Sequence, residues 1–194
     1  MNIEKFTKVY VSELKSILDK IDPSIVSDIV SSINKTIGKK SRIYILGNGG
    51  SSATASHMVN DLGAGLRRRK LLNLDIVSLG DNAPVVTAIA NDIGYENIFY
   101  MQMKGLINVD DVIIAISCSG NSPNIVKAAT YAKELGCEII GVTGFDGGLL
   151  KKMSDINFHI DATENEYGLV EDAHMILDHI IYSYYIQSES NFDR

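Results

Sequence analysis

The chain has 194 residues, 45% hydrophobic and 22% charged, with a formal net charge of −6 at pH 7. This length suits one domain with a substantial core, and the acidic balance argues against a general affinity for nucleic acid or anionic membranes. With only two cysteines, no apolar run near the ~20 residues of a membrane span and no signal-peptide core, we expect a single cytoplasmic domain over residues 1–194 that binds neither nucleic acid nor membrane.

Two amphipathic helices are expected at the start of the chain. Apolar residues recur at three- and four-residue spacing from Phe6 to about Ile37, and Pro23 interrupts the pattern. Asp22 is a suitable N-cap, and a proline is well placed in the first turn of a helix.

A repeated unit follows, in which a short aliphatic strand runs into a glycine-containing turn and then a helix. Nearly all-apolar strands separated by helical stretches indicate a parallel sheet that is covered on both faces. The expected fold is therefore α/β, with a doubly wound parallel sheet flanked by helices. The expected strands are 42–46, 74–78, 111–116, 138–142 and 156–160, and the expected helices are 51–63, 83–91, 95–106, 122–135 and 170–187.

Two glycine- and serine-rich turns stand where a strand ends and a helix begins. Residues 47–51 read GNGGS after the first strand, and residues 117–123 read SCSGNSP after the third. The carboxyl ends of parallel strands are where such sheets bind ligands, and unpaired N–H groups at a helix start suit a phosphate. Alternatively, Ser122 only caps the helix that begins at Pro123, and the glycines only permit tight turns. Two such turns in one domain favour an anion site. Neither turn has the spacing of an NTPase or dinucleotide-binding loop.

Three motifs together resemble those of the sugar isomerase (SIS) family. They are GNGGS followed by an alanine-rich helix with a histidine, AxxNDxGYEN over residues 88–97, and ISxSGNSPN over residues 116–124. Within the family the chain is most similar to the phosphoheptose isomerases, and the resemblance covers nearly the whole chain. It implies an SIS-type, flavodoxin-like fold. The implied activity converts sedoheptulose 7-phosphate into D-glycero-D-manno-heptose 7-phosphate for lipopolysaccharide, capsule or other surface polysaccharide synthesis.

The resemblance also implies an assembly and a set of site residues. It implies a homotetramer with active sites between subunits, N-terminal helices (residues 1–40) in the oligomer interface, and one zinc ion per site. His57 and His179 match the family's two site histidines. The positions that match its phosphate- and substrate-binding residues are Asn48, Gly49, Gly50, Ser51, Asn91, Asp92, Ser117, Ser119 and Ser122.

Two positions depart from the family pattern. Asp61 stands where those isomerases have glutamate, and Glu171 stands where they have glutamine, two residues after Leu169 in place of an arginine. Either the acid–base carboxylate has moved, or the chain is a sister enzyme that acts on a different phosphosugar.

Aldose–ketose isomerisation moves a proton between C1 and C2 through an enediol, and it needs a base, a proton donor and a means to hold the developing charge. His57 and Asp61, four residues apart, share one helix face. With Glu171 and His179 they form a nitrogen–oxygen set that suits a divalent metal such as Zn²⁺. Glu171 and His179 are ~12 Å apart along a helix, so they meet only if their side chains reach toward each other or different subunits supply them. We expect Asp61 or Glu171 to be the base and His179 the acid.

The remaining polar candidates are given structural interpretations. Asp172 and Asp178 are expected on the solvated face of the last helix, and His174 lies too far round that helix from His179 to join it. His159 is expected to be structural, and Cys118 to be a small filler in the serine turn.

Two other functions stay open. The chain could isomerise another phosphosugar, or it could be a non-enzymatic SIS protein that binds the bacterial replication initiator or senses phosphosugars in a transcription factor. The absence of a helix-turn-helix segment disfavours the sensor, and the retained histidines and carboxylates favour catalysis.

Overall fold

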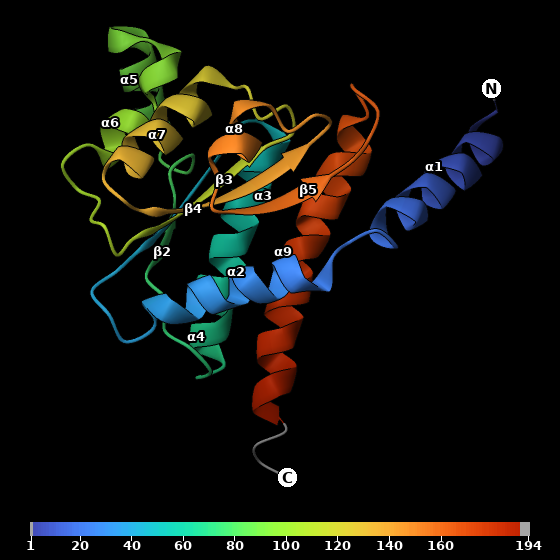
Figure 1. Ribbon diagram of the computed structural model, residues 1–194, viewed down its shortest axis with the longest axis horizontal. Helices are drawn as coiled ribbons and strands as arrows, with labels where there is room; N and C mark the ends of the chain where they lie inside the picture. The colour runs from blue at the N-terminus through green and yellow to red at the C-terminus, as the bar shows by residue number, and fades with distance from the viewer. Residues whose placement is uncertain (1, 191–194) are drawn as a thin grey trace.

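A computed structural model describes residues 2–190, which form a parallel sheet with helices on both faces (Figure 1). The strand order is β2-β1-β3-β4-β5, and every neighbouring pair is parallel. The order reverses between β1 and β3, because the chain leaves β1 for one edge of the sheet and returns to build the other side. The doubly wound prediction is confirmed. The strands are β1 (Ile43–Gly47), β2 (Ile76–Ser78), β3 (Val112–Ser117), β4 (Glu138–Gly144) and β5 (Ile156–Ile160).

Helices cover the sheet in two groups, and each group closes its own apolar core. Alternate strand residues serve the two cores: Ile43 and Ile45 face α2, α3 and α9, while Tyr44 and Leu46 face α6 and α7. This burial on both faces is why the strands are nearly continuous apolar runs. The helices are α1 (Ile3–Leu18), α2 (Pro23–Thr36), α3 (Gly50–Met58), α4 (Leu66–Arg68), α5 (Ala83–Ile93), α6 (Tyr100–Met103), α7 (Pro123–Glu134), α8 (Gly148–Met153) and α9 (Tyr167–Ser190).

Three helical segments differ from the prediction. The helix expected over residues 51–63 continues from α3 as a π-helix, Val59–Gly65, before α4. The helix expected over 95–106 is replaced by a 3₁₀ turn, Tyr95–Asn97, and the short α6. The third segment, α8, was not expected, since its six residues are too few to show a helical period.

Small residues let the π-helix fit its surroundings. A Cβ at Gly63 would lie 2.8 Å from the side chain of Ile76 in β2, and one at Gly65 would lie 3.0 Å from the hydroxyl of Tyr182 in α9. π-Helical segments are rare and occur frequently at functional sites. This one carries Asp61.

The N-terminal helices differ in how they join the body. Asp22 caps α2 as expected, with its carboxylate accepting a hydrogen bond from the N–H of Ser24 at 2.8 Å. By contrast, α1 reaches away from the sheet (Figure 1), and none of its residues is buried in the described protomer. Its link to α9 includes a hydrogen bond from the Tyr10 hydroxyl to Asp172 at 2.7 Å.

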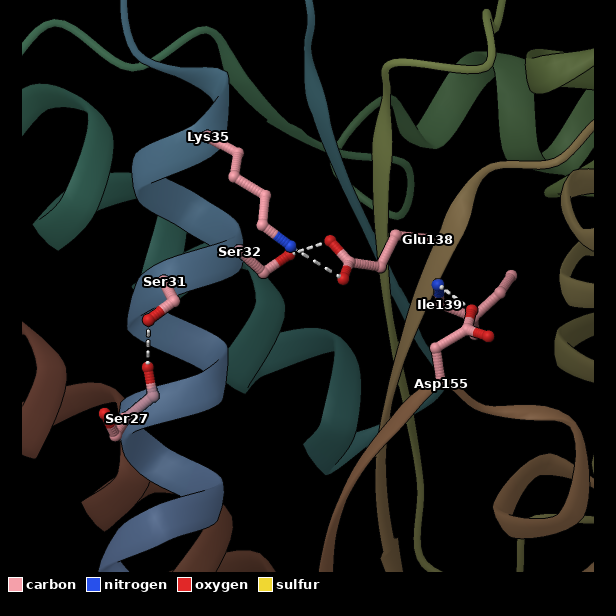
Figure 2. A network of polar contacts seen from close by, with 7 residues as sticks. All are labelled: Ser27, Ser31, Ser32, Lys35, Glu138, Ile139 and Asp155. Carbon is pink, nitrogen blue, oxygen red and sulfur yellow. Dashed lines mark hydrogen bonds and ion pairs between the residues drawn. The ribbon is translucent and has the colours of Figure 1, made fainter.

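A polar network holds α2 against the start of β4 (Figure 2). The carboxylate of Glu138 accepts a hydrogen bond from the Ser32 hydroxyl and pairs with the Lys35 ammonium at 3.4 Å. An exposed pair of this kind contributes about 0–1 kcal/mol. The buried Ile29 and Ile33 therefore supply most of the attachment, and the network fixes the position of α2 along the strand.

Across residues 2–190, no helix has both the length and the apolar character needed to cross a bilayer.

Candidate active site

A pocket of about 170 Å³ opens at the carboxyl ends of β1 and β3, where the strand order reverses. Its walls come from both glycine- and serine-rich turns and from the first turns of α9. We call it the serine pocket. It is lined by Asn48, Ser51, Ile116, Ser117, Cys118, Ser119, Ser122, Tyr167 and Glu171.

The second turn is folded tightly around a glycine. Gly120 has a φ of +61°, and a Cβ there would lie 1.9 Å from the carbonyl oxygen of Gly147, so no other residue fits. The Ser117 hydroxyl accepts a hydrogen bond from the N–H of Gly120 at 3.2 Å and lies 3.3 Å from the hydroxyl of Ser122. The turn thereby directs two hydroxyls to the start of α7.

Ser122 is the N-cap residue of α7, but within the described chain its side chain makes no capping hydrogen bond. Its backbone carbonyl accepts from Val126 at 2.9 Å, as in any helix start. The interpretation of Ser122 as a helix cap alone therefore loses its main support. The hydroxyl lines the pocket instead.

Asn48 ties the two turns together. Its side chain exchanges hydrogen bonds with Asn124 at 2.9 and 2.8 Å, and its oxygen also accepts from the Tyr95 hydroxyl at 2.9 Å. The amide oxygen is thus already occupied by two donors. Asn48 holds the pocket wall in place, and the hydroxyls beside it are the freer donors.

Glu171 brings a carboxylate into the pocket, and glycine makes the room for it. A Cβ at Gly50 would lie 2.3 Å from a carboxylate oxygen of Glu171, so only glycine lets this group lie against the start of α3. The neighbouring Gly49 has a φ of +53°.

Burial, and then the charge of Glu171, raise the pKa of Cys118 to about 11. Its thiol therefore stays protonated and acts as the small filler that the sequence indicates.

Further along the same two helices, four side chains converge. We call them the His–Asp cluster: His57 of α3, Asp61 of the π-helix, and Asp178 and His179 of α9. One donor atom from each lies within 4.8 Å of all the others. The Nε2 atom of His57 is 3.2 Å from Nε2 of His179, 3.6 Å from a carboxylate oxygen of Asp61 and 3.8 Å from one of Asp178.

The prediction that Asp178 lies on the solvated face of α9 is wrong. Its side chain is 0% exposed, and neither carboxylate oxygen has a hydrogen-bond partner among residues 2–190. Burial, and then the charge of Asp61, raise the pKa of Asp178 to about 7. A signal for this was present: Asp178 lies four residues after His174 and eight after Val170, on the helix face that packs against the sheet.

The other predicted residues are spread more widely. Glu171 lines the serine pocket and is not one of the residues that meet in the cluster within the described protomer. Asn91 and Asp92 are exposed on α5, hydrogen-bonded to each other at 2.9 Å and outside the serine pocket. His174 points into the core, with Nε2 3.1 Å from the carbonyl of Thr143, and so stays apart from His179 as expected.

The chemistry of the His–Asp cluster fits a divalent cation. Two imidazole nitrogens and two carboxylate oxygens are a donor set that Zn²⁺ and related metals accept. The buried carboxylate of Asp178 favours an ion over a plain surface cluster, because neither of its oxygens accepts a hydrogen bond in the described chain and burying such a group is costly.

Comparison with known proteins agrees with this architecture. The SIS domain family model matches residues 9–144. The chain is 34% identical to a phosphoheptose isomerase of Geotalea daltonii, over 87% of this chain and 85% of that protein. It is also 34% identical to a phosphoheptose isomerase of Helicobacter pylori, over 92% and 91%. The solved structure of phosphoheptose isomerase GmhA from Neisseria gonorrhoeae superposes with a TM-score of 0.83 at 25% identity, covering 96% of this chain and 100% of that one.

Proposed function

The chain belongs to the SIS domain family and is an isomerase of the phosphoheptose isomerase kind, and we propose that it interconverts sedoheptulose 7-phosphate and D-glycero-D-manno-heptose 7-phosphate. The reaction is a proton transfer between C1 and C2 of a phosphosugar through an enediol. The names of the relatives support the substrate, and the pathway we propose is surface polysaccharide synthesis.

One observation carries this proposal: a carboxylate, that of Glu171, faces hydroxyl-lined turns within a single pocket. We place the sugar phosphate against the second turn, where the hydroxyls of Ser117, Ser119 and Ser122 and the start of α7 supply neutral donors and a favourable dipole. Like charges repel, so the phosphate lies away from Glu171. The carboxylate is then left for the carbon end of the sugar.

We assign the base to Glu171 rather than to Asp61. Glu171 lines the pocket, whereas the Asp61 carboxylate accepts a hydrogen bond from Asn60 at 2.8 Å and faces the His–Asp cluster. In this assignment Glu171 takes the proton from one carbon and returns it to the other, and the hydroxyl proton of the sugar passes between its own O1 and O2 atoms.

We propose that His57, Asp61 and His179 hold one zinc ion per site. A divalent cation bound there supplies Lewis acidity that polarises the sugar carbonyl. A histidine nitrogen that binds a metal cannot also transfer a proton. We therefore assign His179, the acid in the prediction from the sequence, to the metal together with His57. Asn60 orients the Asp61 carboxylate by its hydrogen bond.

We also propose that the chain forms a homotetramer through residues 1–40. The exposed apolar side chains of α1, among them Ile3, Phe6 and Val9, support this arrangement. Light scattering on the purified protein tests it. A monomer at micromolar concentration contradicts the tetramer and leaves the isomerase assignment standing.

The decisive experiment is an NMR assay of the purified protein with a panel of five- to seven-carbon phosphosugars, with and without added Zn²⁺. We expect turnover of sedoheptulose 7-phosphate, with solvent deuterium appearing at C1 or C2 of the sugar. Turnover of a different sugar alone rejects the heptose substrate. No turnover of any sugar in either condition rejects the isomerase and returns attention to a binding role.

A further inference from the structure

We propose that Asp178 is a metal ligand, so that the His–Asp cluster is a two-histidine, two-carboxylate site built within one protomer and independent of Glu171. This inference deepens the proposed function, since it concerns the ion that we place in the same site.

The Asp178 side chain is buried without a hydrogen bond in the described chain. It is 0% exposed, and both of its oxygens lack a hydrogen-bond partner among the described residues. Buried carboxylates are ordinarily paired, hydrogen-bonded or bound to metal. The nearest opposite charge available is a protonated His57, whose Nε2 atom is 3.8 Å away, too far for a hydrogen bond.

The donor atoms of the His–Asp cluster are spaced closely enough to surround one ion. Ligands at about 2.0–2.1 Å from a tetrahedral ion are roughly 3.3 Å from one another. The distances from Nε2 of His57 to His179, Asp61 and Asp178 are 3.2, 3.6 and 3.8 Å. Along these three edges the donors lie within about 0.5 Å of that spacing, and along the other three they lie within 4.8 Å of one another.

A neighbouring side chain orients one of the carboxylates of the cluster. The π-helix carries Asp61, and Asn60 occupies one Asp61 oxygen at 2.8 Å, while the other oxygen faces His57. Such an outer hydrogen bond orients a ligating carboxylate. Asp178 and His179 are consecutive on α9, where one is buried and the other exposed.

The charge balance also gives Glu171 and Asp178 different roles. Asp61 and Asp178 together neutralise a divalent ion, so the cluster needs no third carboxylate. Glu171 precedes Asp178 by seven residues, ~10 Å along the helix. The serine pocket is thereby left with its own carboxylate, Glu171.

The test measures metal binding without any sugar. Chelator-stripped protein is titrated with Zn²⁺ in competition with a chromophoric chelator, and with Co²⁺ for its visible spectrum. We expect one ion per wild-type chain. Asp178→Asn is expected to weaken Zn²⁺ at least about 10-fold and to change the Co²⁺ spectrum, since even outer-shell partners are worth roughly 10- to 100-fold.

Two variants on the same helix serve as matched controls. Glu171→Gln removes the pocket carboxylate, and Asp172→Asn removes an exposed one; both are expected to bind Zn²⁺ like the wild type. Should Asp178→Asn fold poorly, Asp178→Leu tests the same point through thermal unfolding with and without Zn²⁺. We expect the metal-dependent rise in Tm to shrink in the Leu variant, even if its metal-free form is as stable as the wild type or more so.

Three outcomes overturn the inference: wild-type protein that binds no metal, Asp178→Asn protein that binds Zn²⁺ normally, or a loss of Zn²⁺ in Glu171→Gln. These results are distinct from a failure of the proposed function. Zinc binding with no sugar turnover rejects the isomerase and keeps the Asp178 ligand. Sugar turnover by a wild-type protein that binds no Zn²⁺ in the titration rejects the Asp178 ligand and keeps the isomerase.

Discussion

The serine pocket and the His–Asp cluster lie on the same two helices, α3 and α9, yet they are built by different means. The pocket is made where helices begin, from short hydroxyls and backbone held by glycine turns. The cluster is made from imidazole and carboxylate side chains at the end of α3, in the π-helix that follows it and in the middle of α9, where position depends on helical phase. The two regions are therefore expected to separate in one direction: damage to the pocket lowers turnover and spares metal binding, whereas damage to the cluster weakens metal binding and, through the lost polarisation of the carbonyl, also lowers turnover.

Glu171→Gln is expected to give the largest difference between an effect on turnover and an effect on zinc content. We expect turnover to fall by about 10²- to 10⁴-fold, the usual contribution of a general base, while zinc content stays at the wild-type level. NMR kinetics and elemental analysis of one preparation measure both. A parallel loss of metal and turnover would show that Glu171 also contributes to metal binding, so that the pocket and the cluster act as one site.

His57→Ala is expected to damage the His–Asp cluster and leave phosphate binding in the serine pocket intact. Removal of a ligand is expected to weaken Zn²⁺ by more than about 100-fold and to abolish the stabilisation by zinc, which is about 2.7 kcal/mol at 100 times Kd. Thermal unfolding with added inorganic phosphate serves as the control, because the serine pocket should still bind that ion. Retained zinc stabilisation would contradict the cluster as a metal site.

Gly50→Ala perturbs the pocket without removing a functional group. The new Cβ would lie 2.3 Å from a Glu171 oxygen, so the carboxylate must move. A displacement of this kind is expected to cost about 10- to 100-fold in turnover. The protein should not unfold more easily, since alanine is the better helix former by about 1 kcal/mol. Wild-type turnover would show that the position of Glu171 is unimportant.

Ser122→Ala distinguishes a ligand-binding hydroxyl from a helix cap. We expect inorganic phosphate to bind about 10-fold more weakly, as for a lost hydrogen bond to a charged group. The free energy of unfolding should stay within about 0.5 kcal/mol, the usual range away from such features. A true cap would cost about 1 kcal/mol instead. Calorimetric titration and urea unfolding give the two numbers.

The smallest effect concerns His174, which lies on α9 between the two regions and faces the core. Burial lowers its pKa to about 4, so between about pH 6.5 and pH 4 the unfolded chain binds a proton that the folded chain refuses. Stability therefore falls as the pH drops through this window, by about 0.8 kcal/mol at pH 6. We expect His174→Gln to remove this contribution from the wild-type pH profile of urea unfolding; identical profiles would contradict it.

Much of the architecture could be predicted from the sequence because it depends on local patterns. Apolar runs located all five strands, and Asp22 before Pro23 located the start of α2. The two turns were visible because glycine and serine mark them directly. Their meeting in one pocket follows from the strand order.

The cluster was harder because tertiary contacts override the usual preferences of charged residues. Because aspartate is rarely buried without a partner, residue type alone predicts a solvated Asp178, although its spacing from Val170 and His174 places it on the packed face. A search for a 3.6-residue period does not reveal the π-helix around Asp61. Chemistry and the family resemblance together group Glu171 with His179, on the condition that their side chains reach toward each other or come from different subunits; within this protomer they lie in different regions.

The cluster also sets an order of events in biosynthesis. His57 and His179 are 122 positions apart, so at roughly 5–20 residues per second the second histidine is made about 6–24 s after the first. Every strand of the sheet is synthesised in that interval except β1, which comes earlier. A product that stops short of residue 178 lacks two of the four donors. Under the arrangement proposed above, a molecule that carries its ion is one whose translation has passed the last strand and most of the last helix.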